Sequence, residues 1–436
     1  MGIVKALSYV TLSLALLGCG HFNWYVHGVP LEDFTAQNGS YFPSFIKRYF
    51  PFARNFEKDH KVLSLAKDGV RLIQILPLTR QKSYQNETNL SWSADGVYLS
   101  YEIEGSRERK IMVKNLDGNY SKHLAMLPKT RLSGLRQSFN AALSWSKNST
   151  RYAFMSNGGQ GEYNIYLGAV GASKDTILAK SPSKDGSATW SPATNEIAFV
   201  SARSGGGDIY VLDLDSKELE RLSKAPHMEL YPEWSPDGEN VVYSQRIGSY
   251  HQLALNTRKQ GKDRFHKAHT LTKWPYDNLR PIVSPNGRYI SFYANSARVD
   301  GKTGWNIHVV PFSRRHTYSM QELKDTIVAR NVVLDLHTGP AWTPDSQKIL
   351  YVKKDSKYHN PICAYELFTG RRYRLNTGTK MNRDILISKL GVISFRAQMG
   401  AWDKVFVALT NQGLQLQKQD QTIISKIHYL DWKKKG

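Results

Sequence analysis

Cysteine is scarce in this sequence, because only Cys19 and Cys363 occur among its 436 residues. Cys19 ends an apolar N-terminal run, whereas Cys363 lies in the segment PICAYEL near the other end of the chain. Two cysteines in such different contexts are a poor basis for a disulfide. We therefore expect no bond between them, and we interpret Cys363 as a small buried hydrophobic residue.

Motifs of several common chemistries are also missing. The sequence contains no G-x-S-x-G, which a peptidase of the hydrolase type needs for its nucleophile. Its 13 histidines form no H-E-x-x-H, and its cysteines form no C-x-x-C. His266 and His269 lie three residues apart in a loop rich in Lys and Arg, which we interpret as solvated surface. We expect no metal, no cofactor and no enzymatic activity.

Acidic residues are outnumbered, with 37 Asp and Glu against 59 Lys and Arg and a formal net charge of +22. Such a balance favours an anionic neighbourhood, for example phosphate-bearing lipid, lipopolysaccharide or acidic glycan. A solvated basic surface with no specific partner is the alternative. The basic residues are scattered and no nucleic-acid-binding module is present, so we expect no nucleic-acid partner.

The N-terminal apolar run, residues 6–17, has about a dozen residues, whereas a membrane-spanning helix needs roughly 20. It therefore predicts a removable export signal. The adjoining Leu16-Leu17-Gly18-Cys19 resembles the bacterial lipobox. The resemblance implies a signal peptide over 1–18, lipid attachment at Cys19, and a mature protein anchored to a membrane by that lipid. An ordinary secretory signal that happens to contain a cysteine is the alternative.

Gly20 stands where Asp often marks retention in the inner membrane, so the same resemblance implies an outer-membrane lipoprotein of the cell envelope, facing the periplasm. Residues 19–60 are rich in aromatics and are broken by prolines. We interpret them as a lipidated tether that precedes the folded body over 61–436.

A repeat dominates that body. Six ten-residue segments align without gaps, 44 to 59 residues apart. They are WSADGVYLSY from Trp92, WSKNSTRYAF from Trp145, WSPATNEIAF from Trp190, WSPDGENVVY from Trp234, VSPNGRYISF from Val283 and WTPDSQKILY from Trp342. We call the first residue of each segment its anchor.

Every copy of the repeat has Ser or Thr after the anchor. Four copies have Pro at the third position and five have Asp or Asn at the fourth, and these are turn-forming residues. An alternating strand follows and ends in an aromatic residue, which predicts one buried face. A further strand comes 19 to 24 residues after each anchor, for example DIYVLDL. Four short antiparallel strands per repeat are typical of a propeller blade. We assign the anchors to packing between blades.

A seventh, degraded copy starts near Ile387. The strand-like runs in 61–85 and the C-terminal IHYLDW could pair to form an eighth blade from both termini, or stay apart and leave seven. We expect an all-β protein, a single β-propeller of seven or eight four-stranded blades, with eight favoured. Closure by the N- and C-terminal strands would protect open sheet edges.

The W-S-P-D-G turn, followed by an apolar strand and a D-I-Y-V strand, resembles the repeat of the TolB-like propeller superfamily over roughly residues 60 to 432. The resemblance implies one of several roles: a periplasmic scaffold, the gating domain of a peptidase, or an oligosaccharide lyase. The chain departs from TolB itself because it has no separate α/β domain before the propeller and carries its own lipid signal. Fold alone does not decide among these roles.

The strand that leads into each anchor is expected to line the central channel, where propellers usually bind ligands. Asn140 and Asp185 lie on such strands, and the candidate ligand-binding residues that we carry forward are Tyr231, Glu233, Asp277, Arg280, Asp335 and His337. A water-filled channel without a ligand is the alternative. The leading hypothesis is a monomeric, lipid-anchored binding or scaffold protein for an envelope protein or glycan. The competing hypothesis is a lyase-type enzyme acting on an anionic polysaccharide.

Overall fold

A computed structural model gives the fold of the chain. It describes residues 72–77, 85–104, 108–115, 121–123, 138–157, 162–172, 175–178, 181–223, 228–259, 265–299, 302–355, 360–370, 372–375, 377, 379–389, 391–399 and 401–410. The expected signal peptide, Cys19, the expected tether and the C-terminal IHYLDW lie outside the described residues. Within them the structure is almost entirely β, with one short helix, α5 (Met320–Lys324).

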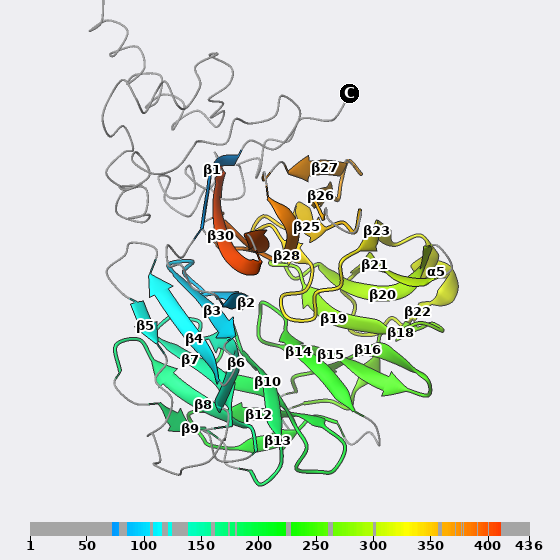
Figure 1. The fold of residues 1–436 in the computed structure, drawn as a ribbon. Helices are drawn as coiled ribbons and strands as arrows, with labels where there is room; N and C mark the ends of the chain where they lie inside the picture. The colour runs from blue at the N-terminus through cyan, green and yellow to red at the C-terminus, as the bar shows by residue number, and fades with distance from the viewer. Residues whose placement is uncertain are drawn as a thin grey trace, which may run out of the picture.

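Seven four-stranded antiparallel blades form a ring (Figure 1). Blade 1 contains β2 (Asn86–Trp92), β3 (Tyr98–Glu104), β4 (Glu108–Asn115) and β5 (Ser121–His123). Blade 2 contains β6 (Ser138–Trp145), β7 (Arg151–Ser156), β8 (Asn164–Ala169) and β9 (Thr176–Ile177). Blade 3 contains β10 (Asp185–Trp190), β11 (Glu196–Ser201), β12 (Asp208–Asp213) and β13 (Leu219–Arg221).

Blade 4 contains β14 (Glu229–Trp234), β15 (Asn240–Ile247), β16 (Tyr250–Thr257) and β17 (His269–Thr270). Blade 5 contains β19 (Asn278–Val283), β20 (Tyr289–Val299), β21 (Lys302–Pro311) and β23 (Ile327–Val332). Blade 6 contains β24 (Ala341–Trp342), β25 (Lys348–Val352), β26 (Ile362–Glu366) and β27 (Arg372–Leu375). A short parallel pair, β18 (Thr272–Lys273) with β22 (Tyr318–Ser319), lies between blades 4 and 5.

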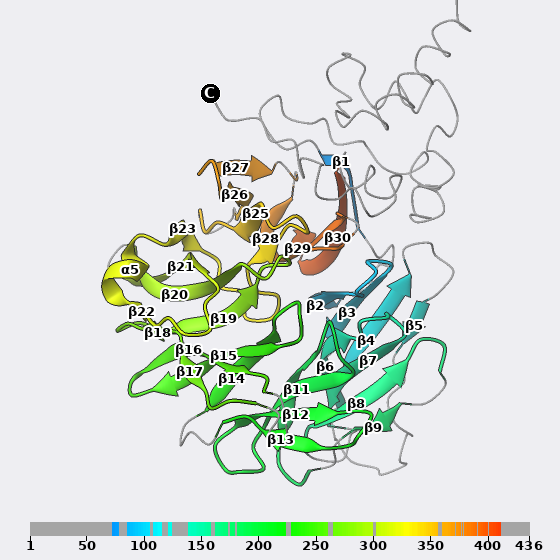
Figure 2. The same ribbon diagram turned by 180° about the vertical axis from the view of Figure 1, so that it is seen from behind.

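Blade 7 closes the ring, and it joins the two ends of the described chain. It contains β28 (Lys380–Ile387), β29 (Ile393–Met399), β30 (Trp402–Thr410) and β1 (Leu72–Pro77). The N-terminal β1 is its outermost strand and pairs antiparallel with β30, as both ribbon views show (Figures 1 and 2). The preference for eight blades was therefore wrong. The degraded copy at Ile387 needs only one more strand to be complete, and the N-terminal run supplies it.

The repeat's turn residues form the network that the sequence predicts, as blade 5 shows. The Ser284 hydroxyl donates to Asn286 Oδ1 at 2.7 Å and accepts from the Tyr289 amide at 3.0 Å. Asn286 Oδ1 also accepts from the Arg288 amide, and Gly287 has a φ of 70°. Such a turn links each innermost strand to the next strand of its blade.

The hydrophobic core lies between neighbouring blades. One cluster joins Ala153 and Ile165 of blade 2 to Trp190 and Phe199 of blade 3. The aromatic residue that ends each aligned segment is buried in all six copies. Three anchor indoles also donate to the preceding blade: Trp92 to Ser394 Oγ, Trp234 to the Thr189 carbonyl and Trp342 to Ser291 Oγ. The anchors are thus blade-to-blade packing residues, as the repeat predicts.

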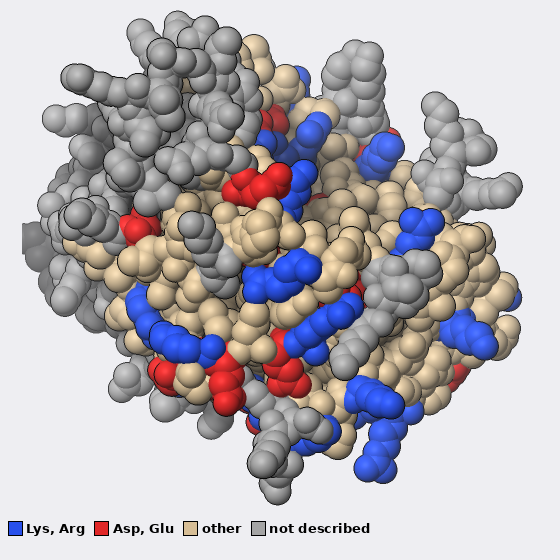
Figure 3. All heavy atoms as spheres, turned by 90° about the horizontal axis from the view of Figure 1, so that it is seen from below, with Lys and Arg blue, Asp and Glu red and all other residues tan. Residues whose placement is uncertain are grey.

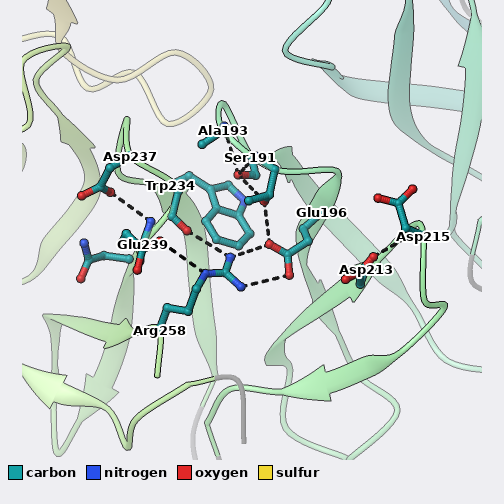
Figure 4. Close-up of polar contacts among 12 residues, drawn as sticks. Ser191, Ala193, Glu196, Asp213, Asp215, Trp234, Asp237, Glu239 and Arg258 are labelled. Carbon is teal, nitrogen blue, oxygen red and sulfur yellow. Dashed lines mark hydrogen bonds and ion pairs between the residues drawn. The ribbon is translucent and has the colours of Figure 1, made fainter. Parts of the chain in front are cut away.

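An ion pair reinforces one of these interfaces, between blades 3 and 4 (Figure 4). The Arg258 guanidinium binds both carboxylate oxygens of Glu196 on β11. It also lies 5.9 Å from the centre of the Trp234 ring and donates to the Gly238 carbonyl at 3.1 Å. One side chain of blade 4 therefore holds a carboxylate, an indole and a turn together.

Candidate ligand-binding channel

A cavity of about 680 Å³ lies where the innermost strands of the blades converge. Residues of β2, β6, β10, β14, β19 and β28, and of the segment that leads into β24, contribute to its wall. Its volume lies within the range of pockets that hold small ligands, and it combines many apolar side chains with a few polar ones. Residues from every blade therefore meet at one site.

A β-bulge at the same place in each repeat shapes this wall. In six blades the pairing between the innermost strand and its neighbour shifts register just before the anchor. With Ile387 as the anchor of blade 7, the residue three positions before the anchor, called position −3 below, has a positive φ of 48° to 74° in all seven blades. These residues are Asn89, Ala142, Ser187, Tyr231, Arg280, Gly339 and Asp384. Bulges of this kind redirect side chains, and five of the seven residues line the cavity.

The residue five positions before the anchor, by contrast, is buried in blades 1, 3, 4, 5 and 7, whereas in blade 6 it is His337, a residue of the cavity wall. Glu229 accepts from the Ile209 amide of blade 3 at 3.0 Å, and Glu87 accepts from the Val405 amide of blade 7 at 2.9 Å. Asn382 donates to the Asn360 carbonyl of blade 6 at 2.8 Å. Asp185 occupies the same position in blade 3 and pairs with Arg203 at 3.2 Å. None of these four side chains lines the cavity. The first three bind their blade to the preceding one, whereas the partner of Asp185 lies in its own blade.

Four of the sequence-predicted residues meet in one part of the cavity, which we call the polar corner: Tyr231, Glu233, Arg280 and His337. Arg280 is its centre. Its Nη1 lies 3.4 Å from Glu233 Oε2 of blade 4, and its Nη2 donates to the His337 carbonyl of blade 6 at 2.8 Å. Within the described part of the chain, the Tyr231 hydroxyl and the His337 ring form no hydrogen bond. The polar corner thus presents unpaired donors and acceptors beside a fixed cation.

Burial changes the acidity of these groups. It raises the pKa of the Glu233 carboxyl, and the Arg280 charge opposes that rise. Burial lowers the pKa of His337; Asp335 opposes that fall, and Arg280, Arg396 and Arg109 add to it. His337 is therefore neutral at pH 7, so its ring has one donor and one acceptor nitrogen.

The other two predicted residues do not line the cavity. Asp277 accepts from the His251 amide and contacts its ring, both at 2.9 Å, at the hairpin of blade 4. Asp335 is buried and caps the turn that carries His337, accepting from the amides of His337 and Thr338. Asp335 positions a lining residue, and Asp277 fastens blade 4 to blade 5. The side chain of Asn140 lies outside the described residues.

Sequence reasoning missed Asn89, Arg109 and Glu102 in blade 1. Asn89 and Arg109 line the cavity. Behind them, the buried Glu102 accepts from Asn89 Nδ2 at 2.7 Å and from the Ala142 amide at 2.8 Å, and lies 3.5 Å from Arg109 Nη1. The −3 spacing from each anchor would have found Asn89. No local pattern points to Glu102 or Arg109, because the packing of blade 1 on blade 2 creates their roles.

Other site types find no support in the described part of the chain. It contains no cluster of three or more His, Cys, Asp or Glu placed to hold a metal ion, and no helix long and apolar enough to cross a membrane. On the side of the molecule seen in Figure 3, Lys and Arg are interspersed with Asp and Glu. Cys363 is buried in β26, as expected for a small hydrophobic residue.

Comparison with known proteins agrees with this architecture. Residues 55–310, more than half of the chain, match the family model described as the TolB beta propeller domain. A stretch of 143 residues is 26% identical to the uncharacterized peptidase YuxL of Bacillus subtilis, covering 26% of this chain and 22% of the relative. Another of 50 residues is 42% identical to the Tol-Pal system protein TolB of Geobacter sulfurreducens, covering 12% of each. The chain thus spans less than a quarter of either relative.

Among solved structures, an oligogalacturonate lyase in complex with manganese superposes with a TM-score of 0.57. The match covers 81% of this chain and 96% of the lyase, at 11% identity. A likeness at that identity concerns the fold alone.

Proposed function

This chain belongs to the TolB beta propeller family, and on that basis we propose that it is a lipid-anchored binding or scaffold protein of the bacterial envelope, holding a protein or glycan partner at its central channel. The observation that carries the proposal is the channel itself. Its wall is mostly apolar, but it converges on the polar corner, where Arg280 lies beside hydrogen-bonding groups that the described chain leaves unused. Ligand sites have this composition.

The envelope location rests on the lipobox-like Leu16-Leu17-Gly18-Cys19 and on the name of the TolB relative, which belongs to the Tol-Pal system. The direct test is palmitate labelling of the expressed protein beside a Cys19→Ser variant, followed by membrane fractionation. We expect label and membrane association in the unmodified chain, and the loss of both in the variant. If neither the unmodified protein nor the variant is labelled, the lipid anchor is contradicted. Binding at the channel is tested by a separate experiment.

Binding at the channel is tested with a photoreactive benzoylphenylalanine in place of Leu386, a half-buried apolar residue of the cavity wall. The same group at the exposed Thr150 is the control. Irradiation of cells is expected to give a discrete adduct from position 386 only. If neither position gives an adduct, or both give the same ones, binding in the channel is wrong.

A lyase-type enzyme acting on an anionic polysaccharide is the second candidate, and the polar corner favours it. A neutral His337 is suited to accept a proton, and the adjacent Arg280 is suited to hold a uronate. The test is turnover of uronic-acid polymers by the purified protein, with loss of turnover in His337→Ala. A protein that cleaves no such polymer would exclude this candidate and leave the binding role.

A further inference from the structure

The seven internal repeats allow a comparison of equivalent positions within one chain. The residue after the anchor is Ser or Thr in every blade. Position −3 is the opposite case, because its seven residues are of seven different types, Asn, Ala, Ser, Tyr, Arg, Gly and Asp. The backbone at −3 is nevertheless constant, with φ between 48° and 74° throughout. The repeat therefore keeps the shape of this position and varies only its side chain.

That backbone shape disfavours most of the side chains found on it. A positive φ is free of strain only for glycine and is tolerated by Asn and Asp, whereas Ala, Ser, Tyr and Arg adopt it at a cost. If position −3 faced an empty channel and its side chain had no function, glycine would be the residue with the least backbone strain there. Strained residues that persist usually serve a function. Four blades nevertheless carry Ala142, Ser187, Tyr231 and Arg280 there.

The two −3 residues that do not line the cavity have local explanations. In blade 6 a Cβ on Gly339 would lie 2.8 Å from Ile282 Cγ1 and 3.1 Å from Arg280 Cγ, so only glycine fits. In blade 7 Asp384 is buried and pairs with Arg396 Nε at 2.6 Å. The remaining five project from five consecutive blades onto the cavity wall.

We propose that Asn89, Ala142, Ser187, Tyr231 and Arg280 form a specificity ring: they are the side chains by which the channel selects its ligand. Ser187 and Tyr231, whose side chains form no hydrogen bond within the described part of the chain, are expected to have no essential role in folding. The proposal rests on the channel-binding function above. The ring is asymmetric, with a cation on blade 5, hydroxyls on blades 3 and 4 and a methyl group on blade 2. It suits a ligand with one anionic group at Arg280 and hydrogen-bonding groups along Ser187 and Tyr231.

Blade 3 offers a matched pair of substitutions. Ser187 is in the ring and its hydroxyl has no hydrogen-bond partner among the described residues, whereas Ser191, four residues later, is fully buried and accepts from Ala193 N, Thr194 N and Thr194 Oγ1. We expect Ser187→Gly to melt at or above the temperature of the unmodified full-length protein, because glycine relieves the positive φ. Ser191→Gly is expected to lower it by about 2 °C or more. An equal loss in both variants would show that Ser187 serves folding and would overturn the ring.

A second experiment tests ligand selection and uses the benzoylphenylalanine at position 386 as its probe. With that group in place, Ser187→Gly and Tyr231→Gly are each expected to reduce the adduct yield at least about tenfold, or to change the adduct, while the folded protein is retained. An unchanged adduct in both variants overturns the ring but leaves channel binding intact. No adduct in the parent protein overturns channel binding and the ring's ligand role together.

Discussion

Glu102 is a buried acidic residue behind the cavity wall of blade 1. It lies on β3 with 1% of its side chain exposed, and it joins two bulge residues of neighbouring blades, Asn89 and Ala142. Burial raises the pKa of its carboxyl to about 7, against the lowering effects of Asn89, the Ala142 amide and Arg109; Glu104 adds to the rise. The cavity wall at blade 1 therefore depends on a group that titrates near neutral pH.

Because the folded pKa of Glu102 lies above its ordinary value, the folded state binds the proton more tightly than the unfolded state does. Its contribution to stability is greatest below pH 4.5 and is lost as the pH rises through about 7. The free energy of unfolding should fall by about 1.4 kcal/mol per pH unit in this window on account of this group. The free energy of unfolding can be measured by urea denaturation at pH 5, 6 and 7. Its fall per pH unit should be smaller by that amount in Glu102→Gln than in the unmodified protein. Parallel curves for the two proteins would contradict the assignment.

At the scale of strands and blades, much of the stability lies in the contacts between successive blades. Core clusters straddle these interfaces, anchor indoles donate across them, and buried acids at the starts of innermost strands accept amides from the preceding blade. The Arg258 and Glu196 pair is the most accessible to experiment, because its two side chains come from different blades (Figure 4).

Glu196→Gln should cost about 2 kcal/mol, since Arg258 would keep its charge at the interface without its carboxylate partner. The cost falls short of the full penalty for a buried pair because the Arg258 side chain is 20% exposed. Arg314→Ala is the control: its pair with Asp237 is about half exposed on both sides and should contribute less than about 0.5 kcal/mol. Urea denaturation measures both. Equal effects would mean that the interface does not depend on this pair.

The strands and their order could be predicted from the sequence because a propeller blade is a local structure. Each W-S-P-D-G turn and its following strand appear within one repeat, so the six aligned copies predict six blades. The channel was only partly predictable. Tyr231, Glu233, Arg280 and His337 were named because they lie close to an anchor, and all four line the cavity. The bulge before the anchor helps to decide which strand residues of blades 4 and 5 face the cavity, and it cannot be read from the sequence because it depends on the strand register. Asp185, Asp277 and Asp335 were expected to line the channel and do not line this cavity.

At the scale of the whole molecule, the number of blades is decided by a pairing that spans most of the chain. β1 and β30 are separated by more than 300 residues, and no repeat pattern relates them. The expectation of an eighth blade came from treating leftover strands at both ends as a unit. The structure instead uses one N-terminal strand to complete blade 7, so that a sequence-distant contact holds the ring shut. Because of this closure, the stability of the first blade and that of the last blade depend on each other.

Loss of the β1 pairing should therefore affect the closure of the ring, whereas loss of an outer strand elsewhere should affect only its own blade. In β1, Ile75→Pro with Leu76→Pro removes two consecutive amides, one of which faces β30 whichever way the strand is turned. The outer strand of blade 3 offers the matched change, Leu219→Pro with Glu220→Pro in β13, which also disrupts one ladder. Both should weaken their blades by about 3 kcal/mol, but only the first opens the ring. Limited proteolysis should then cut the β1 variant between blades 7 and 1, while the β13 variant is cut only at blade 3. The same fragment pattern in both would mean that β1 merely covers an edge, and that contacts between β28 and β2 suffice to close the propeller.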